Sequence, residues 1–248
     1  MREKKLMIEI HNDTKDCVLC GDQLKKLNDR VDALCDYCGK NATVSYQCGN
    51  MHLICDNCLK MDVYEYIKTA CLKYKGTDPI ELAVHIMNSP QIKMHGPEHH
   101  FIVPAVMLRV LHNTGKINTD INYLLDLAGK RAIGESPQHC DFHAGNCGAA
   151  IGTGIFLSIF QDRDIFSEDM WSDTNKIVSF AMKTVLESHG PRCCKRDTYL
   201  SIESAVDYIN EHFAINLPIS EAKCTFSLRN KTCGREDCNY YNMGLSLV

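Results

Sequence analysis

The chain has 248 residues, of which 45% are hydrophobic and 23% charged, proportions that are ordinary for a globular protein with a substantial core. Its formal net charge of −4 argues against general electrostatic capture of nucleic acid or of an anionic membrane. MREKKLMIEI has no leader-like apolar segment, and no apolar run of 18 residues follows, so we expect a cytoplasmic protein with no membrane span. Its 15 cysteines favour metal ligation, because disulfides are disfavoured in the cytoplasm, and so many thiols suggest a reducing, anaerobic cell.

Residues 1–16 are expected to form a short strand or arm, and a dense set of metal-ligand residues follows. The thiols come mostly as CxxC pairs, a spacing typical of tetrahedral zinc sites because a tight turn presents two thiolates to one ion. Eight ligand residues within 42 positions are enough for two zinc ions. These residues are Cys17, Cys20, Cys35, Cys38, Cys48, His52, Cys55 and Cys58.

The pairing of these eight residues has several solutions. A cross-brace would join Cys17, Cys20, Cys48 and His52 in one site and Cys35, Cys38, Cys55 and Cys58 in the other, whereas a sequential pairing or one zinc with spare thiols stays open. Some forty residues cannot build an adequate core, so we expect zinc to supply about 10 kcal/mol of folding free energy per ion. This treble-clef or cross-brace-like module, at residues 1–60, could bind a protein or RNA partner, although it has few basic residues.

From position 61 the hydrophobic pattern becomes helical, and a mainly α-helical domain is predicted over 61–248. Its first helix starts near Met61 and buries Cys71, and the second starts at Asp78 and Pro79 and stops between 88 and 90. Further helices are predicted from Pro104, over 119–133 with Thr119 as cap, over 148–160, over 172–187, and from Asp197 to Phe213.

Three histidines and a carboxylate lie close together in a loop expected before the helix at Pro104. Imidazole and carboxylate groups at this density could bind a metal or move protons near neutral pH. A solvated polar loop, or a set of helix-capping residues, is the alternative. We predict a catalytic role for His95, Glu98, His99 and His100.

The stretches HCDFHAGNCGAAIGTGIF (139–156) and GPRCCKR (190–196) are expected to form one buried metal or iron–sulfur centre. The soft ligands would be Cys140, Cys147, Cys193 and Cys194, and the glycines and alanines of 148–154 would let a helix or an inorganic cluster approach the backbone. Cys147 is expected at a helix N-terminus, where the helix dipole stabilises a thiolate. For the adjacent pair, a strained vicinal disulfide or one structural thiol is the alternative.

The C-terminal segment adds three more cysteines in a loop-rich sequence. Their spacing suits a metal site that is completed from elsewhere in the chain, or a cluster with one open iron. These residues are Cys224, Cys233 and Cys238.

The motifs HGPEHH, CGAAIG and GPRCCKR, preceded by the paired cysteines, resemble those of an uncharacterised domain family of archaea and anaerobic bacteria. The resemblance covers nearly the whole chain and implies no established activity, although fusions of some members to methyltransferase domains point to cofactor or RNA modification. The chain departs from the family pattern around 142–146, which leaves His143 without an implied role. Cys147, Cys193 and Cys194 are also loosely similar in arrangement to the ligands of iron–sulfur serine dehydratases and cysteine desulfidases. That likeness implies a [4Fe-4S] cluster with one open iron as Lewis acid and Glu98 or His99 as proton carrier.

Together these patterns predict a metalloprotein with zinc and a [4Fe-4S] cluster, acting as a lyase or in sulfur transfer on a small molecule. One alternative is a zinc-stabilised binding or assembly module for a protein or RNA partner. Another is a thiol redox or sulfur relay at Cys193 and Cys194 without a cluster.

Overall fold

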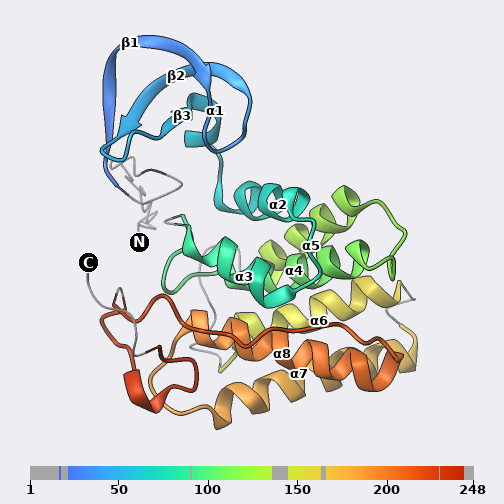
Figure 1. The fold of residues 1–248 in the computed structure, drawn as a ribbon. Coiled ribbons are helices and arrows are strands. Elements are labelled where there is room, and N and C mark those ends of the chain that lie inside the picture. The colour runs from blue at the N-terminus through green and yellow to red at the C-terminus, as the bar shows by residue number, and fades with distance from the viewer. Residues whose placement is uncertain are drawn as a thin grey trace, which may run out of the picture. The chain divides into compact units, whose positions relative to one another are not determined.

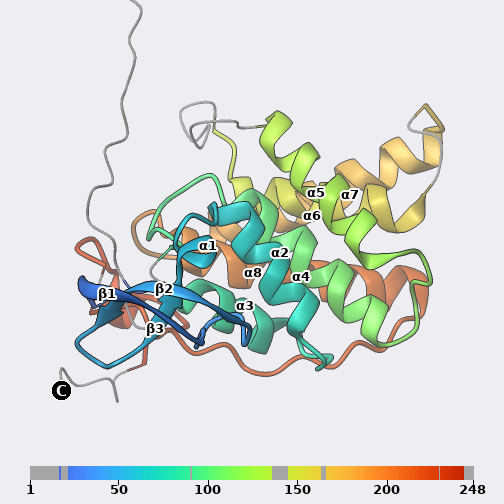
Figure 2. The same ribbon diagram turned by 90° about the horizontal axis from the view of Figure 1, so that it is seen from above.

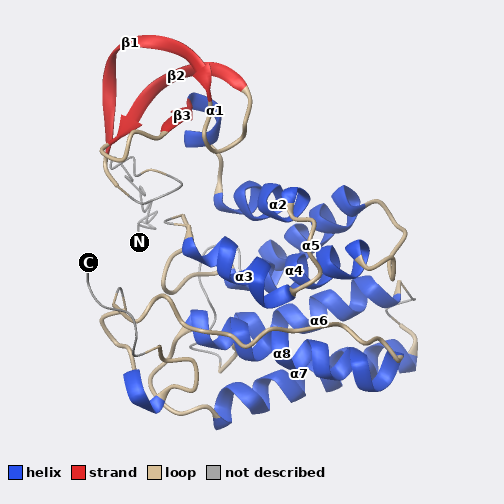
Figure 3. Cartoon of the chain, in the orientation of Figure 1, coloured by secondary structure: helices blue, strands red, loops and turns tan. Residues whose placement is uncertain are grey.

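The computed structural model describes Cys17 and residues 22–89, 91–135, 145–162, 166–228 and 230–242. The chain divides into two compact units, Met1–Met61 and Asp62–Val248 (Figure 1). Within the described residues the protein is mostly helical, with eight α-helices, and its three strands all belong to the first unit (Figure 3). The prediction of a mainly helical protein is therefore confirmed.

The first unit is a three-stranded antiparallel sheet with a one-turn helix. Its elements are β1 (Leu24–Leu34), β2 (Asn41–Cys48), β3 (Leu53–Cys55) and α1 (Asp56–Leu59), and the strands are ordered β1-β2-β3. The pairing of β1 with β2 shifts register between Lys26 and Val31, so β1 bends across the shorter β2. The turn after β1 and the end of β3 thereby carry cysteines toward the same place.

The core of the first unit consists largely of thiols. Its strictly apolar buried side chains are Leu24, Val44 and Ile54, and the other five members of the cluster are cysteines: Cys17, Cys35, Cys48, Cys55 and Cys58. Partly buried hydrophobic side chains, among them Leu27, Tyr46 and Leu53, pack against this cluster. The apolar core of the unit is therefore small, and cysteines that could hold a metal ion occupy much of it.

The second unit is a helical bundle around one buried helix. Helix α4 (His99–Asn113) is buried at every position from His99 to Leu111, and it packs against five other helices (Figure 2). Those neighbours are α2 (Val63–Lys73), α3 (Pro79–Asn88), α5 (Ile121–Glu135), α6 (Gly148–Gln161) and α8 (Cys194–Phe213). Helix α7 (Glu168–Glu187) covers α6 and α8.

After α8 the chain returns along the bundle as an extended loop that ends in a short 3-10 helix, Arg235–Asp237 (Figure 1). This loop is fastened to both ends of α3. The Ser220 N–H donates to Asp78 Oδ2 at 3.0 Å, and the Thr225 hydroxyl donates to Asn88 Oδ1 at 2.8 Å. The three C-terminal cysteines are thereby brought back to the start of α8.

Some helix starts agree with the sequence and others do not. Asp78 caps α3 as predicted, because its Oδ1 accepts from the N–H groups of Ile80 and Glu81. Pro104, predicted to open a helix, lies inside α4, which starts at His99. The missing N–H of one proline removes a single hydrogen bond, and the burial of both ends of α4 outweighs that loss.

Two other predicted caps are also wrong. The cap of α5 is Asp120 and not Thr119, because the Asp120 carboxylate accepts from the Tyr123 N–H at 2.9 Å. Helix α8 starts three residues before Asp197, since the Asp197 N–H already donates to the Cys193 carbonyl at 2.9 Å. In the same way α7 starts at Glu168, earlier than predicted, with Ser167 as its cap.

No helix among the described residues combines the length and the apolar character needed to cross a membrane.

Candidate functional site

The first unit contains a compact group of four thiols that could hold a metal ion. The sulfurs of Cys35, Cys38, Cys55 and Cys58 all lie within 4.8 Å of one another, and Cys38 Sγ is 4.0 Å from Cys55 Sγ. The turn after β1, the end of β3 and helix α1 supply them. Four thiolates that bind one tetrahedral ion with bonds of about 2.3 Å lie about 3.8 Å from one another, which is close to this spacing.

A second group in the same unit contains Cys17, Cys48 and His52, whose ligand atoms also lie within 4.8 Å of one another. His52 Nδ1 is 3.4 Å from Cys48 Sγ and 3.7 Å from Cys17 Sγ. The two groups alternate along the chain, as in the cross-brace pairing. Cys20, predicted as the fourth ligand of this group, lies outside the described residues.

Neighbouring thiols of the four-thiol group affect the pKa values of Cys35, Cys55 and Cys58. Burial raises the pKa of Cys35, but N–H groups of Cys38, Cys55 and Tyr37 outweigh it and lower the pKa to about 7. Burial raises the pKa of Cys55 and of Cys58, and the neighbouring thiols add to the rise. Four ionised thiols this close repel one another unless a positive ion lies between them.

In the second unit, three helices begin around one cavity of about 220 Å³, which we call the thiol cavity. The first turns of α4, α6 and α8 line it, and the positive ends of these helix dipoles point toward it, while the last turns of α7 also contribute Met182, Val185 and Leu186. Two guanidinium groups lie on its wall, and that of Arg196 is paired with Asp197. Its chemically active lining residues are His99, Cys147, Arg192, Cys194, Arg196 and Asp197.

His99 presents a buried nitrogen with a free lone pair at this cavity. Its Nδ1 donates to the Gly96 carbonyl at 3.1 Å, which assigns the proton to Nδ1. Its Nε2 is buried and has no hydrogen-bond partner within the described part of the chain. Burial, together with the charge of Lys195, lowers the pKa of His99 well below its usual value, so the imidazole stays neutral.

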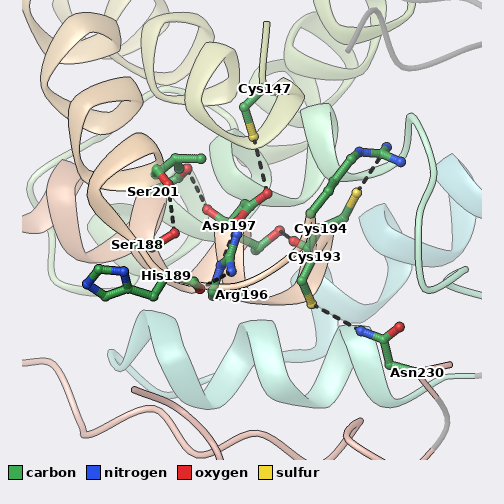
Figure 4. Close-up of polar contacts among 12 residues, drawn as sticks. Cys147, Ser188, His189, Cys193, Cys194, Arg196, Asp197, Ser201 and Asn230 are labelled. Atoms are coloured by element: carbon green, nitrogen blue, oxygen red, sulfur yellow. Dashed lines mark hydrogen bonds and ion pairs between the residues drawn. The ribbon is translucent and has the colours of Figure 1, made fainter. Parts of the chain in front are cut away.

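Cys147 is the N-cap of α6, as predicted, and its thiol faces a carboxylate on α8 (Figure 4). Cys147 Sγ donates to Asp197 Oδ2 at 3.9 Å, while Asp197 Oδ1 accepts from Arg196 Nε at 3.0 Å. Burial raises the pKa of Asp197, and the Arg196 guanidinium opposes that rise. Arg196 is itself held by the His189 carbonyl, to which its Nη1 donates at 2.6 Å.

The adjacent Cys193 and Cys194 point to opposite sides of the chain (Figure 4). Cys194 is the first residue of α8 and lines the thiol cavity, where Arg192 Nη2 donates to its sulfur at 3.4 Å. Cys193 is the N-cap and faces Asn230, whose Nδ2 donates to its sulfur at 3.7 Å. The predicted set of Cys147, Cys193 and Cys194 is therefore divided between two places.

Cys193 lines a separate cleft with the three C-terminal cysteines, and we call it the four-thiol cleft. Three aromatic side chains, those of Tyr199, Phe226 and Tyr240, also line it. Burial raises the pKa of Cys193 and of Cys224, and the other thiols of the cleft raise that of Cys224 further. The four sulfurs are those of Cys193, Cys224, Cys233 and Cys238.

The four residues of the predicted histidine loop have different surroundings. His99 and His100 belong to the first turn of α4 and not to a loop, and Glu98 Oε1 accepts from the Lys93 N–H at 2.8 Å. His100 Nδ1 donates to the Pro97 carbonyl at 3.0 Å. His95 has a buried Nδ1 without a hydrogen-bond partner among the described residues, and of the four only His99 lines the thiol cavity.

Sequence reasoning missed the cavity's charged residues, and it placed other residues in segments that are not described. The sequence predicts only a helix start for Asp197 and no role for Arg192, although the position of both in GPRCCKRD, beside two thiols, is a usable signal. Cys140 and His143 lie outside the described residues.

Comparison with known protein families covers most of the second unit. Residues 67–241 match a family described as a family of unknown function, DUF5714. The chain belongs to this family. The matched range contains both the thiol cavity and the four-thiol cleft, and it excludes the two compact groups of the first unit. No curated protein and no solved structure gave a match, so the likeness to serine dehydratases rests on the arrangement of cysteines alone.

Proposed function

We propose that the DUF5714 unit is a thiol-dependent enzyme that transfers sulfur from or to a small anionic molecule. The observation that carries this proposal is the convergence of three helix N-termini on one cavity that also holds two thiols and two arginines. Helix N-termini attract anions and lower the free energy of a thiolate. A nucleophile and an anion-binding wall therefore share one space.

Cys147 is the proposed nucleophile, because it is more exposed than Cys194 and has a proton acceptor beside it. Asp197 Oδ2 takes the proton of the Cys147 thiol, and the thiolate attacks the outer sulfur of an anionic persulfide donor. A bond forms between Cys147 Sγ and that sulfur while the donor's own S–S bond breaks. The electron pair leaves with the inner sulfur as the donor's thiolate, and Cys147 becomes a persulfide.

The other cavity residues support this step. Arg192 and the helix N-termini stabilise the negative charge of the donor and of the leaving thiolate. The Nε2 lone pair of His99 accepts a hydrogen bond from the S–H group of the donor, which orients the outer sulfur. The lyase with an open iron, the other reaction predicted from the sequence, has less support because its three proposed ligands do not face one another.

For the first unit we propose a structural role, with zinc in both compact groups. Thiolate and imidazole donors at tetrahedral spacing fit zinc, and the core of this unit is otherwise too small to fold alone.

The test compares two thiol reagents of nearly equal size, the anion iodoacetate and the neutral iodoacetamide, on the full-length protein purified without oxygen. For each thiol, the rate of reaction with iodoacetate is divided by the rate with iodoacetamide. We expect this ratio to be at least tenfold higher for Cys147 than for free glutathione. Arg192→Gln should remove most of this preference. Peptide mass spectrometry assigns the labelled cysteine, and Cys71, which is fully buried with a pKa raised to about 12, serves as the unreactive internal control.

A second measurement addresses the transfer itself. Incubation with glutathione persulfide should add one sulfur atom to Cys147, and Cys147→Ser should abolish the addition. A Cys147 that does not react would contradict the proposed function. So would a preference for iodoacetate that is the same in the native protein and in Arg192→Gln.

A further inference from the structure

The four-thiol cleft takes no part in the sulfur-transfer step, and its geometry is that of a ligand site. One sulfur comes from the N-cap of α8, and three come from the loop that returns along the bundle. The fold thus brings Cys193 to the same cleft as three cysteines that lie more than 30 positions later in the sequence. The Asn230 side chain donates to Cys193 Sγ at 3.7 Å.

Backbone N–H groups point at these sulfurs in the way they do in metal–thiolate turns. The Phe226 N–H donates to Cys224 Sγ at 3.3 Å, and the Arg235 N–H donates to Cys233 Sγ at 3.4 Å, each two residues after its cysteine. The four-thiol group of the first unit has hydrogen bonds of the same kind. Several backbone N–H groups donate to Cys35 Sγ there, including the Cys55 N–H at 3.3 Å. These bonds stabilise the ionised sulfur, which is the form that binds metal.

The backbone at Arg235 is strained to allow this arrangement. Its φ is +48°, in the left-handed region that a side chain with a Cβ adopts at a cost of about 1 kcal/mol or more. The turn directs the Arg235 N–H at Cys233, and the Cys238 N–H donates to the Arg235 carbonyl at 2.9 Å. Arg235 thus links Cys233 and Cys238 through its own N–H and carbonyl groups.

The spacing of the sulfurs distinguishes a cluster from a single ion. Around one ion, four thiolates lie about 3.8 Å apart. Among the described residues, the compact ligand groups are the two of the first unit, and the thiols of the cleft do not form a third. In a cubane cluster the thiolates are farther apart, because each binds a different iron.

The surroundings suit an anionic cluster. Arg196 lines the cleft beside Cys193, and its guanidinium is also paired with Asp197. Cys193 lies at the positive end of a 20-residue helix. The aromatic side chains on the wall limit the access of water, while the helix end and the guanidinium offset negative charge.

From these observations we infer that the four-thiol cleft binds a [4Fe-4S] cluster, with one iron ligated by each of Cys193, Cys224, Cys233 and Cys238. Every iron would then have a protein thiolate, so no iron remains open for a substrate, and the cluster would carry electrons or stabilise the C-terminal loop. This inference goes beyond the proposed sulfur transfer, which uses neither the cleft nor iron.

The experiment is reconstitution of the full-length protein with ferrous iron and sulfide without oxygen, followed by iron and sulfide analysis, visible absorption and electron paramagnetic resonance after reduction. About four irons and four sulfides per chain are expected. The adjacent cysteines provide a matched pair of variants. Cys193→Ser should lose at least half of the bound iron and sulfide, whereas Cys194→Ser, one residue away but facing the thiol cavity, should keep both.

Cys224→Ser provides a second variant in a different segment, so that a folding defect at the start of α8 cannot account for the result. Equal iron in Cys193→Ser and Cys194→Ser, or binding of one zinc at the cleft with no iron or sulfide, would overturn the inference. The outcome is independent of the alkylation of Cys147, so either proposal can fail while the other stands.

Discussion

At the scale of single residues, two glycines of CGAAIG explain how the site is assembled. A Cβ added at Gly148 would overlap the His100 ring, and one added at Gly152 would lie 3.0 Å from both the His100 carbonyl oxygen and Val103 Cβ. The sequence left open whether these small residues admit a helix or a cluster. The neighbour is helix α4, and its close approach brings His99 to the same cavity as Cys147.

We therefore expect Gly152→Ala to destabilise the second unit. Overpacking against the α4 backbone costs about 1–3 kcal/mol, which exceeds the gain of about 1 kcal/mol from helix propensity. Gly129→Ala is the control, because Gly129 is also buried in a helix but an added Cβ would meet only Phe101, at an ordinary 3.6 Å. Urea unfolding followed by circular dichroism should give a lower midpoint for Gly152→Ala and an equal or higher one for Gly129→Ala. The reverse order would contradict this account of the packing.

At the scale of secondary-structure elements, the N-termini of the helices determine how the second unit is connected. Asp62 and Asp78 cap α2 and α3 in the same way, since each carboxylate accepts from two N–H groups of its own helix. Of these two residues, Asp78 also uses its second carboxylate oxygen, which accepts a hydrogen bond from the Ser220 N–H, 142 positions away. One of the two caps is therefore also a tertiary contact of the C-terminal loop.

Asp62→Ala and Asp78→Ala should separate these two contributions. Loss of the cap costs about 1 kcal/mol in either variant. Asp78→Ala should cost about 1 kcal/mol more, because a hydrogen bond to a charged acceptor is also lost. Hydrogen exchange should show faster exchange around Ser220 in Asp78→Ala and no change there in Asp62→Ala. Equal exchange in the two variants would mean that the loop is held by other contacts.

Helix existence could be predicted from the sequence, whereas several helix starts could not. Apolar spacing marks the buried side of a helix, and Asp78 with Pro79 marks a start by local chemistry alone. Pro104 and Asp197 have the local chemistry of a helix start, but both lie inside helices. The packing of α4 and the hydrogen bond to the Cys193 carbonyl place the actual starts earlier in the chain. The separation of Cys193 from Cys194 depended on such a start and was therefore missed.

At the scale of the whole molecule, the two units have cores of different chemistry. The bundle is built on aliphatic and aromatic side chains around α4, whereas the first unit has thiols at five of its eight buried core positions. The CxxC spacing was sufficient to predict that Cys35, Cys38, Cys55 and Cys58 lie together, because it is local. The partners of Cys193 and the cavity of Cys147 join segments far apart in sequence, which spacing alone does not reveal.

Metal removal should therefore affect the units differently. A zinc chelator withdraws about 10 kcal/mol of folding free energy per ion from the first unit, so amide protection in β1, β2 and β3 should be lost. Amides of α4 and α6 in the same sample should keep their protection. Hydrogen exchange with peptide mass spectrometry measures both, and retained protection in the strands of the chelated protein would contradict a metal-dependent core.

The start of α8 also constrains how this segment can vary. Each residue of a helix turns the side chain by about 100°, so the facing of Cys193 and Cys194 depends on the number of residues before Asp197. Replacing a neighbour leaves that count unchanged, whereas inserting or deleting one residue would turn each thiol away from its own site. The length of the segment from Cys193 to Asp197 is thus more restricted than its composition.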